Sequence, residues 1–140
     1  MIRAALVEHP IDTGALIAEV ADVSTGATAV FVGTVRDMND GLAVSGIEYS
    51  AYTAMAEREL LRIAQEAARQ FAPLNVVVEH RVGSLALGDV SVGIATSHAH
   101  RAPAIDGMRF VIEEIKRRVP IWKRECYADG TREWVNTAAV

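Results

Sequence analysis

The sequence predicts an α+β domain built around a mostly antiparallel sheet. Segments with helical periodicity and β-branched runs follow one another without a strict alternation of strand and helix, which disfavours a parallel α/β sheet. The length of 140 residues and a hydrophobic content of 51% match one domain with its own core. No linker, repeat or low-complexity segment divides the chain, so we expect a single domain over residues 1–140.

The first part of the chain predicts three strands and one short helix. Residues 2–9 alternate loosely, as a strand does, and residues 12–22 have the apolar spacing of a short helix. Residues 26–36 are rich in β-branched side chains, and residues 44–52 alternate again beyond the turn formers DMNDG. We expect these last two strands to pair as a β-hairpin with a polar tip.

The second part predicts two longer helices and two further pairs of strands. Residues 53–71 show the clearest helical period, and residues 75–85 and 90–99 are strands joined around ALGD, a second hairpin candidate. Residues 103–119 form a helix that a proline ends, and residues 122–135 predict a terminal hairpin that turns at an Asp-Gly pair. On the last helix, the side chains expected to face the core are Ile105, Met108, Ile112 and Ile115.

Composition excludes several classes of protein. The formal net charge of −4 disfavours general binding to nucleic acid or to an anionic membrane. The longest charge-free apolar run, residues 23–35, is too short and too rich in Gly and Thr to span a bilayer, and no signal-like apolar region develops at the start. The lone cysteine, Cys126, cannot form an internal disulfide, which is typical of a reducing compartment. We therefore expect a soluble, cytoplasmic protein.

Positive charge gathers in IKRRVPIWKRE, residues 115–125, where five cationic side chains surround one Pro and one Trp. Lys116 and Lys123 are the only lysines of the chain, against twelve arginines. A lysine among other cations can lose its proton near neutral pH, whereas an arginine stays charged. These two amines are therefore candidates for an acid, a base or a nucleophile. The arginines around them are equally typical of a solvated helix end.

A second group of cations precedes the last helix, in the motif HAHR. A helix N-terminus offers free backbone N–H groups and the positive end of the helix dipole, so His100 and Arg101 beside it could hold a phosphate. Arg36, at the end of its strand, could supply a third donor if the fold brings it near.

The remaining polar residues fit catalysis less well. Cys126 lies in a strand-like segment with no histidine close in sequence, so a small apolar filler is the simpler interpretation. His98 and His100 alternate as on a strand and lack Cys, Asp or Glu at ligand spacing, so we predict no metal site. GTVRDMNDG matches neither a P-loop nor a dinucleotide fingerprint, and the sequence predicts no cofactor.

Four segments, in matching order along nearly the whole chain, resemble the large, catalytic subunit of molybdopterin synthase: FVGTVRD, HRVGSLALGDVSVGIATSHAHR, IKRRVPIWKRE and DGTREWV. The resemblance implies an α/β-hammerhead-like domain with an added antiparallel subdomain. It implies conversion of cyclic pyranopterin monophosphate to molybdopterin. A small ubiquitin-like sulfur-carrier subunit would deliver two sulfurs from its C-terminal Gly-Gly thiocarboxylate. Two large subunits would form a homodimer, and with two carriers a heterotetramer.

The resemblance also implies roles for five residues. By motif position, Lys116 and Lys123 fall on the lysines of the sulfur-transfer centre, and Arg36, His100 and Arg101 fall on substrate-binding positions. The C-terminal NTAAV departs from family members that carry a basic residue and a longer tail there.

Two other functions remain open on the sequence. A non-catalytic module that binds a phosphorylated ligand would use the same cations and would tolerate arginine at both lysine positions. An acyl-lysine enzyme with Cys126 as its nucleophile would be abolished by Cys126→Ala.

Overall fold

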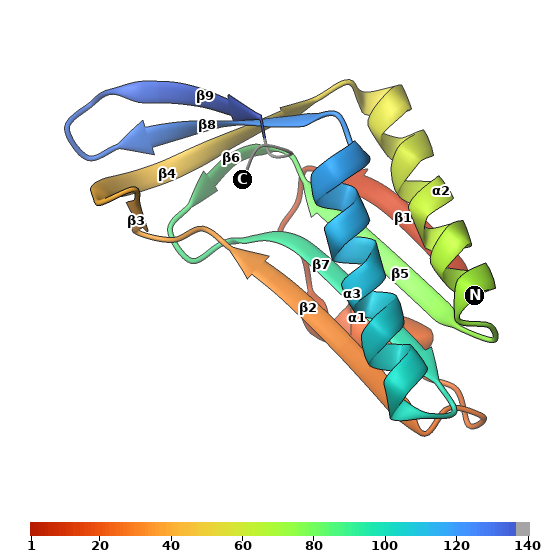
Figure 1. Ribbon diagram of the computed structural model, residues 1–140. Coiled ribbons are helices and arrows are strands. Elements are labelled where there is room, and N and C mark those ends of the chain that lie inside the picture. Colours follow the sequence, from red (N-terminus) through yellow and green to blue (C-terminus); the bar gives the residue numbers. More distant parts are fainter. Residues whose placement is uncertain (137–140) are drawn as a thin grey trace.

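The computed structural model describes residues 1–136 and contains two sheets and three helices (Figure 1). In chain order the elements are β1 (Ile2–Val7), α1 (Thr13–Val20), β2 (Ala27–Thr34), β3 (Met38–Asn39), β4 (Leu42–Ala51), α2 (Thr53–Gln70), β5 (Asn75–Arg81), β6 (Gly83–Ala86), β7 (Val90–His98), α3 (Arg101–Arg118), β8 (Ile121–Tyr127) and β9 (Arg132–Asn136). None of these helices is long and apolar enough to cross a membrane.

The first sheet has the strand order β1-β5-β7-β2, in which only β1 and β5 are parallel. The helices α2 and α3 pack side by side on one face, and α1 covers the other (Figure 1). Val76 and Val78 of β5 therefore belong to the core under α2 and α3, whereas Val77 belongs to the core under α1. The predicted α+β class with a mostly antiparallel sheet is confirmed, because one of the three strand pairings in this sheet is parallel and two are antiparallel.

The second sheet is wholly antiparallel and centres on β4, which pairs with β8 on one edge and with β3 and β6 on the other. The terminal hairpin of β8 and β9 turns at Gly130, whose positive φ of 90° suits a glycine, as the Asp-Gly pair predicted. This sheet stands beside the carboxyl end of α3 (Figure 1). The space between the two sheets is where the candidate site lies.

The first predicted hairpin is wrong in its pairing. β2 pairs along its length with β7, and the hairpin before α2 is formed by β3 and β4 alone. Its turn has positive φ at both Asp40 and Gly41, the geometry of a tight two-residue turn. The DMNDG cluster was therefore correctly assigned as a turn, but local pattern did not reveal the long-range partner of β2.

The second predicted hairpin is confirmed in part. β5 and β7 pair antiparallel, yet the residues between them leave that sheet as β6 and pair with β4. Gly83, with φ of 102°, lets the chain turn towards the second sheet, and Gly88, with φ of 82°, lets it return. This detour ties the two sheets together next to the candidate site.

The last helix buries most of the face predicted for it. Ile115 is buried, and Met108 and Ile112 pack against the core, but Ile105 is 50% exposed. Near the start of the helix Gly107 is buried instead. A Cβ at Gly107 would lie 2.6 Å from a Leu74 methyl, so the missing side chain permits this close packing.

Candidate active site

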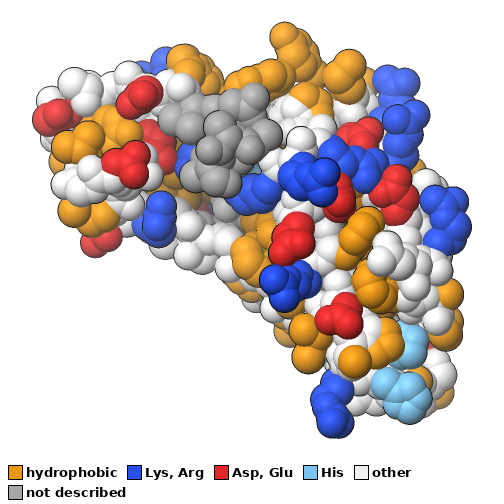
Figure 2. Space-filling view, viewed as in Figure 1, with side chains coloured by type: hydrophobic (Ala, Val, Ile, Leu, Met, Phe, Trp, Pro, Cys, Tyr) orange, Lys and Arg blue, Asp and Glu red, His pale blue; other side chains and the backbone are white. Residues whose placement is uncertain are grey.

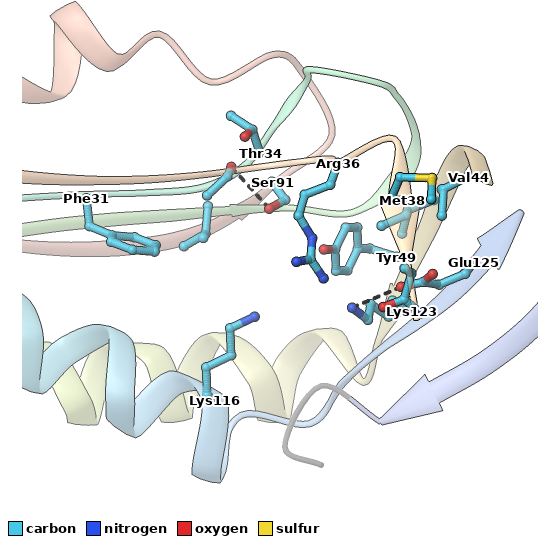
Figure 3. A pocket seen from close by; sticks show the side chains of 14 residues that line it. Phe31, Thr34, Arg36, Met38, Val44, Tyr49, Ser91, Lys116, Lys123 and Glu125 are labelled. Carbon is cyan, nitrogen blue, oxygen red and sulfur yellow. Dashed lines mark hydrogen bonds and ion pairs between the residues drawn. The ribbon is translucent and has the colours of Figure 1, made fainter. Parts of the chain in front are cut away.

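A pocket of about 210 Å³ lies where the first sheet, the second sheet and the end of α3 meet (Figure 3). Its charged lining consists of three cations and one carboxylate, which gives a net positive interior to an acidic protein. These four residues are Arg36, Lys116, Lys123 and Glu125, and the rest of the lining comprises Phe31, Gly33, Thr34, Met38, Asn39, Val44, Ile47, Tyr49, Ser91 and Val92.

Lys116 enters the pocket from the last turn of α3, which Pro120 prevents from continuing. Its side chain is half-buried and points into the space below Arg36 (Figure 3). Burial, and secondly the charge of Lys123, lower the pKa of Lys116 below its ordinary value. The sequence predicted this direction from neighbouring cations, but burial is the larger cause.

Lys123 and Glu125 project into the pocket from the same face of β8, because alternate residues of a strand share a face. The Lys123 Nζ lies 3.1 Å from the Glu125 Oε1, and the two side chains are only 13% and 3% exposed. The Glu125 Oε2 is buried without a hydrogen-bond partner among residues 1–136. Sequence reasoning missed Glu125, although its position two residues after a candidate lysine on a strand could have revealed it.

Arg36 follows β2 and lies on the rim of the pocket with an exposed side chain. Its segment is held by Val35, whose N–H donates to the Asp89 carbonyl at 3.0 Å and whose carbonyl accepts from the Gly88 N–H at 2.9 Å. No carboxylate in the described part of the chain lies within ion-pair distance of Arg36. Its guanidinium is therefore available to an anion that enters the pocket.

Tyr49 lines the pocket, and the buried His80 packs against its ring; both side chains are polar and uncharged. Burial, as the largest cause, lowers the pKa of His80 to about 4, and the Lys116 charge adds to the lowering, so this imidazole is neutral at physiological pH. The ring of Tyr49 packs edge-on against it, with 5.2 Å between the centroids. Burial likewise raises the pKa of Tyr49, which keeps its phenol protonated. Tyr49 reaches between Arg36 and Lys123 as a neutral hydrogen-bonding group (Figure 3).

His100 and Arg101 lie at the other end of α3, beside an open depression that Gly26 and Ala27 also line. Arg101 and Lys116 are fifteen positions apart on one helix, which corresponds to about 22 Å along its axis. Histidine side chains lie at this end of the molecule, away from the second sheet (Figure 2). Within one chain, therefore, Arg36 joins the two lysines and does not join His100 and Arg101.

The two histidines of the HAHR motif lie beside each other. β7 ends at His98, and the His100 backbone N–H donates to the His98 Nδ1 at 3.0 Å. Their ring centroids are 6.0 Å apart. Residues two positions apart on an extended chain share a side, so an expectation that these rings point to opposite faces is wrong.

The other cations of the 115–125 segment have carboxylate partners outside the pocket. Arg118 forms ion pairs with Glu59 and Glu66, and Arg124 pairs with Glu48 while stacking on Trp134. Arg117 is exposed beside a glutamate of its own helix. The solvated-surface interpretation thus fits these arginines and not the two lysines.

Cys126 is partly exposed and lies on β8 one residue from Glu125, so its side chain points away from the lysine pocket. In the described part of the chain, no group of three or more His, Cys, Asp or Glu side chains is arranged to hold a metal ion. The charged groups that line this pocket are two amines, a guanidinium and a carboxylate.

Comparison with known sequences identifies relatives over most of the chain. A family model described as the MoaE protein matches residues 6–118. The molybdopterin synthase catalytic subunit of Halalkalibacterium halodurans is 41% identical over 133 residues, which cover 95% of this chain and 85% of the relative. The protein of the same name from Oryza sativa subsp. indica is 42% identical over 86% of this chain, which spans only 62% of that longer relative.

Solved structures have the same fold. The molybdopterin synthase structure from Staphylococcus aureus superimposes with a TM-score of 0.89 at 35% identity, covering 94% of this chain and 95% of that one. A protein–protein complex of subunits 1 and 2 of the molybdopterin-converting factor from Helicobacter pylori has a TM-score of 0.77 at 23% identity, covering 94% and 89%. The second likeness concerns the fold alone.

Proposed function

Because the chain belongs to the MoaE protein family, we propose that it is the catalytic subunit of a molybdopterin synthase. Its reaction would convert cyclic pyranopterin monophosphate to molybdopterin with sulfur from a carrier thiocarboxylate. The observation that carries the proposal is the convergence of Arg36, Lys116 and Lys123 in one pocket, two of them being the only lysines of the chain.

The charges of this pocket suit the proposed reactants. A thiocarboxylate and a cyclic phosphate are both anions, and bringing them together requires concentrated positive charge. Arg36 and Lys123 supply fixed cations, while Lys116, whose pKa is lowered, can exchange a proton during the transfer. Each transfer moves one sulfur from the carrier tail to the substrate, and with oxygen from water the tail becomes an ordinary carboxylate. Because the carrier supplies the sulfur, a catalytic cysteine is unnecessary.

The proposed partner is a small sulfur-carrier subunit that inserts its Gly-Gly tail into the pocket. The Helicobacter pylori structure of similar fold is a complex of two different subunits, which supports a heteromeric assembly. The pocket itself supports an anionic tail, because its charged groups lie between the two sheets (Figure 3). Glycines fit a confined pocket because they carry no side chain.

The proposed homodimer would bring His100 and Arg101 to the pocket. β2 is an edge strand that, within residues 1–136, pairs only with β7, and it carries no charged side chain. Antiparallel pairing of β2 with its counterpart in a second copy sets Ala27 of one chain beside Thr34 of the other. Ala27 lies near His100 and Thr34 lines the lysine pocket, so each pocket would gain the cations of the second copy.

A carrier-dependence assay tests the proposed reaction. The chain with a thiocarboxylate-ended carrier should produce molybdopterin and consume close to two thiocarboxylates per product. The same carrier ending in a carboxylate should bind without reacting, and the chain with free sulfide should make no product. Product formed from sulfide alone, or a ratio near one, would contradict the carrier mechanism.

A complementation assay tests the shared site. Lys116→Arg and Arg101→Ala chains are each expected to be defective, but a co-expressed mixture should recover about a quarter of the parent activity. This follows because half of the dimers are mixed and one of their two sites is intact. If one chain supplied all five residues to its own site, the mixture would stay as inactive as its components.

A further inference from the structure

The two pocket lysines have different electrostatic surroundings, and one buried carboxylate accounts for the difference. Glu125 contacts Lys123 and is 3% exposed in its side chain, in the middle strand pair of the second sheet. Lys116 has no carboxylate within ion-pair distance in the described part of the chain. The inference below rests on the proposed function and assigns separate roles to the two amines.

Lys123 is the only cation paired with Glu125 among residues 1–136. The neighbouring arginines are occupied elsewhere, since Arg124 pairs with Glu48 and Arg81 pairs with Asp89. The second carboxylate oxygen, Oε2, is buried and has no hydrogen-bond partner among residues 1–136. A buried carboxylate so poorly satisfied depends on its single cation, and the ion pair in turn holds the amine of Lys123 in one position.

Lys116 faces a different set of groups. From the elements packed around it, Lys123 and Glu125 of β8, Arg36 after β2 and the neutral Tyr49 line the same pocket, and the carboxylate of Glu125 is engaged by Lys123. On its own helix the glutamates are engaged by arginines: Glu113 pairs with Arg109, and Glu114 pairs with Arg117 and Arg118. In the described part of the chain Lys116 is therefore left without a carboxylate of its own, so it is the amine that can most easily give up its proton.

We propose that Glu125 is a positioning residue that gives the two lysines different roles in the reaction. Its carboxylate holds Lys123 as a fixed cation for the anionic reactants, and this leaves Lys116 as the amine that exchanges protons. The pair is not explained by stability alone, because a buried ion pair often contributes no more than apolar residues of the same volume. Its value here is that two chemically identical amines acquire unequal reactivity.

Competitive labelling of the full chain tests this division without any assay of sulfur transfer. With only two lysines, the peptides that carry Lys116 and Lys123 are unambiguous in mass spectrometry after brief treatment with an acetylating reagent. Only the neutral amine reacts, so in the parent chain Lys116 should label at least about tenfold faster than Lys123, since an adjacent opposite charge changes amine protonation by that order. Equal labelling in the parent chain would overturn the proposal.

Glu125→Gln keeps the shape of the side chain and removes its charge. In this variant the preference should fall to within about threefold, because Lys123 then also reacts. Glu125→Asp keeps the charge and should restore most of the preference. Glu79→Gln, which neutralises another buried carboxylate on the face of the first sheet covered by α1, is the matched control and should retain it. A preserved preference in Glu125→Gln would overturn the proposal.

The activity of the assembled enzyme supplies a second readout. Glu125→Gln should bind the carrier as the parent does but transfer sulfur at least about tenfold more slowly, with a changed pH–rate profile. A rate loss with an unchanged profile would indicate a merely structural role and would contradict the division of labour. If the labelling result holds and no sulfur transfer is seen in the parent chain, the proposed function fails and the positioning role of Glu125 stands.

Discussion

The two ends of α3 carry similar residue types in very different surroundings. At the carboxyl end, Lys116 is half-buried and faces Lys123, which is paired with a nearly inaccessible Glu125. At the amino end, His100 and Arg101 are exposed and border an open depression. Burial disfavours the charged form of a titratable group, whereas a group exposed to water keeps its ordinary charge. The first end is therefore suited to proton exchange and the second to holding an anion.

The helix dipole emphasises this contrast. The amino end of a helix favours anions, which adds to the effect of Arg101, and the carboxyl end favours a charged lysine. Nevertheless the pKa of Lys116 is lowered, so burial and the charge of Lys123 outweigh the dipole. At the amino end the helix dipole and Arg101 both favour a bound anion. At the carboxyl end the dipole favours a charged Lys116, but burial and Lys123 act against it.

The largest expected effect comes from removing the exchangeable proton at the reactive end. Lys116→Arg should lower single-turnover sulfur transfer at least about 100-fold, because arginine stays protonated while general acid–base catalysis contributes on that scale. Carrier binding, measured by calorimetry, should be unchanged. Arg117→Ala, on the exposed side of the same turn, is the matched control and should stay within about twofold. A Lys116→Arg rate close to the parent rate would show that Lys116 does not exchange a proton in the reaction.

The second-largest expected effect is a loss of stability when the buried ion pair is broken. Lys123→Met leaves the carboxylate of Glu125 buried without its cation, which should cost about 3–5 kcal/mol in the free energy of unfolding. The double variant Lys123→Met, Glu125→Leu removes both charges and should recover most of this loss. Urea denaturation measures both variants. A single variant as stable as the parent would show that Glu125 does not depend on Lys123.

Local patterns predicted most elements and the reactive end of the site. The helical period of residues 53–71 and the turn formers at Gly130 are local properties, and the structure confirms both. The lysine pocket was found because lysine is rare in this chain and a crowded amine has a physical reason to be reactive. The assignment of substrate contacts to Arg36, His100 and Arg101 stays a prediction.

Long-range geometry explains what the sequence did not reveal. The pairing of β2 with β7 joins segments far apart in the sequence and does not depend on the turn that follows β2. Glu125 acquires its role only when β8 turns it inward beside Lys123. The separation of Arg101 from Lys116 was, by contrast, calculable from the length of the predicted helix. The C-terminal segment NTAAV, which departs from family members with a basic residue and a longer tail, lies largely outside the described residues.

The binding end should respond to the loss of one charge by a smaller amount. Arg101→Ala should weaken binding of the pterin substrate by about 1.5–3 kcal/mol, the usual contribution of a charge-assisted hydrogen bond. Calorimetry of the assembled enzyme measures the affinity, and the effect should shrink as salt rises because the site is exposed. Arg109→Ala, further along the same helix and also exposed, is the control. Unchanged affinity in Arg101→Ala would place the phosphate elsewhere.

The smallest expected effect is a shift in the pH dependence of the rate, and it distinguishes the two ends of α3 most directly. If Lys116 acts as a neutral amine, the rate rises with pH through the pKa of Lys116, which burial and the Lys123 charge lower. Lys123→Met removes the like charge, so the pKa of Lys116 should rise and the acid limb of the pH–rate profile should move up by about one unit. Lys123→Arg keeps the positive charge and should leave the limb in place. The binding end predicts a different behaviour, because Arg101→Ala removes a permanent cation and should lower affinity at every pH. An acid limb that moved in Lys123→Arg, or failed to move in Lys123→Met, would mean that a group other than Lys116 controls the proton.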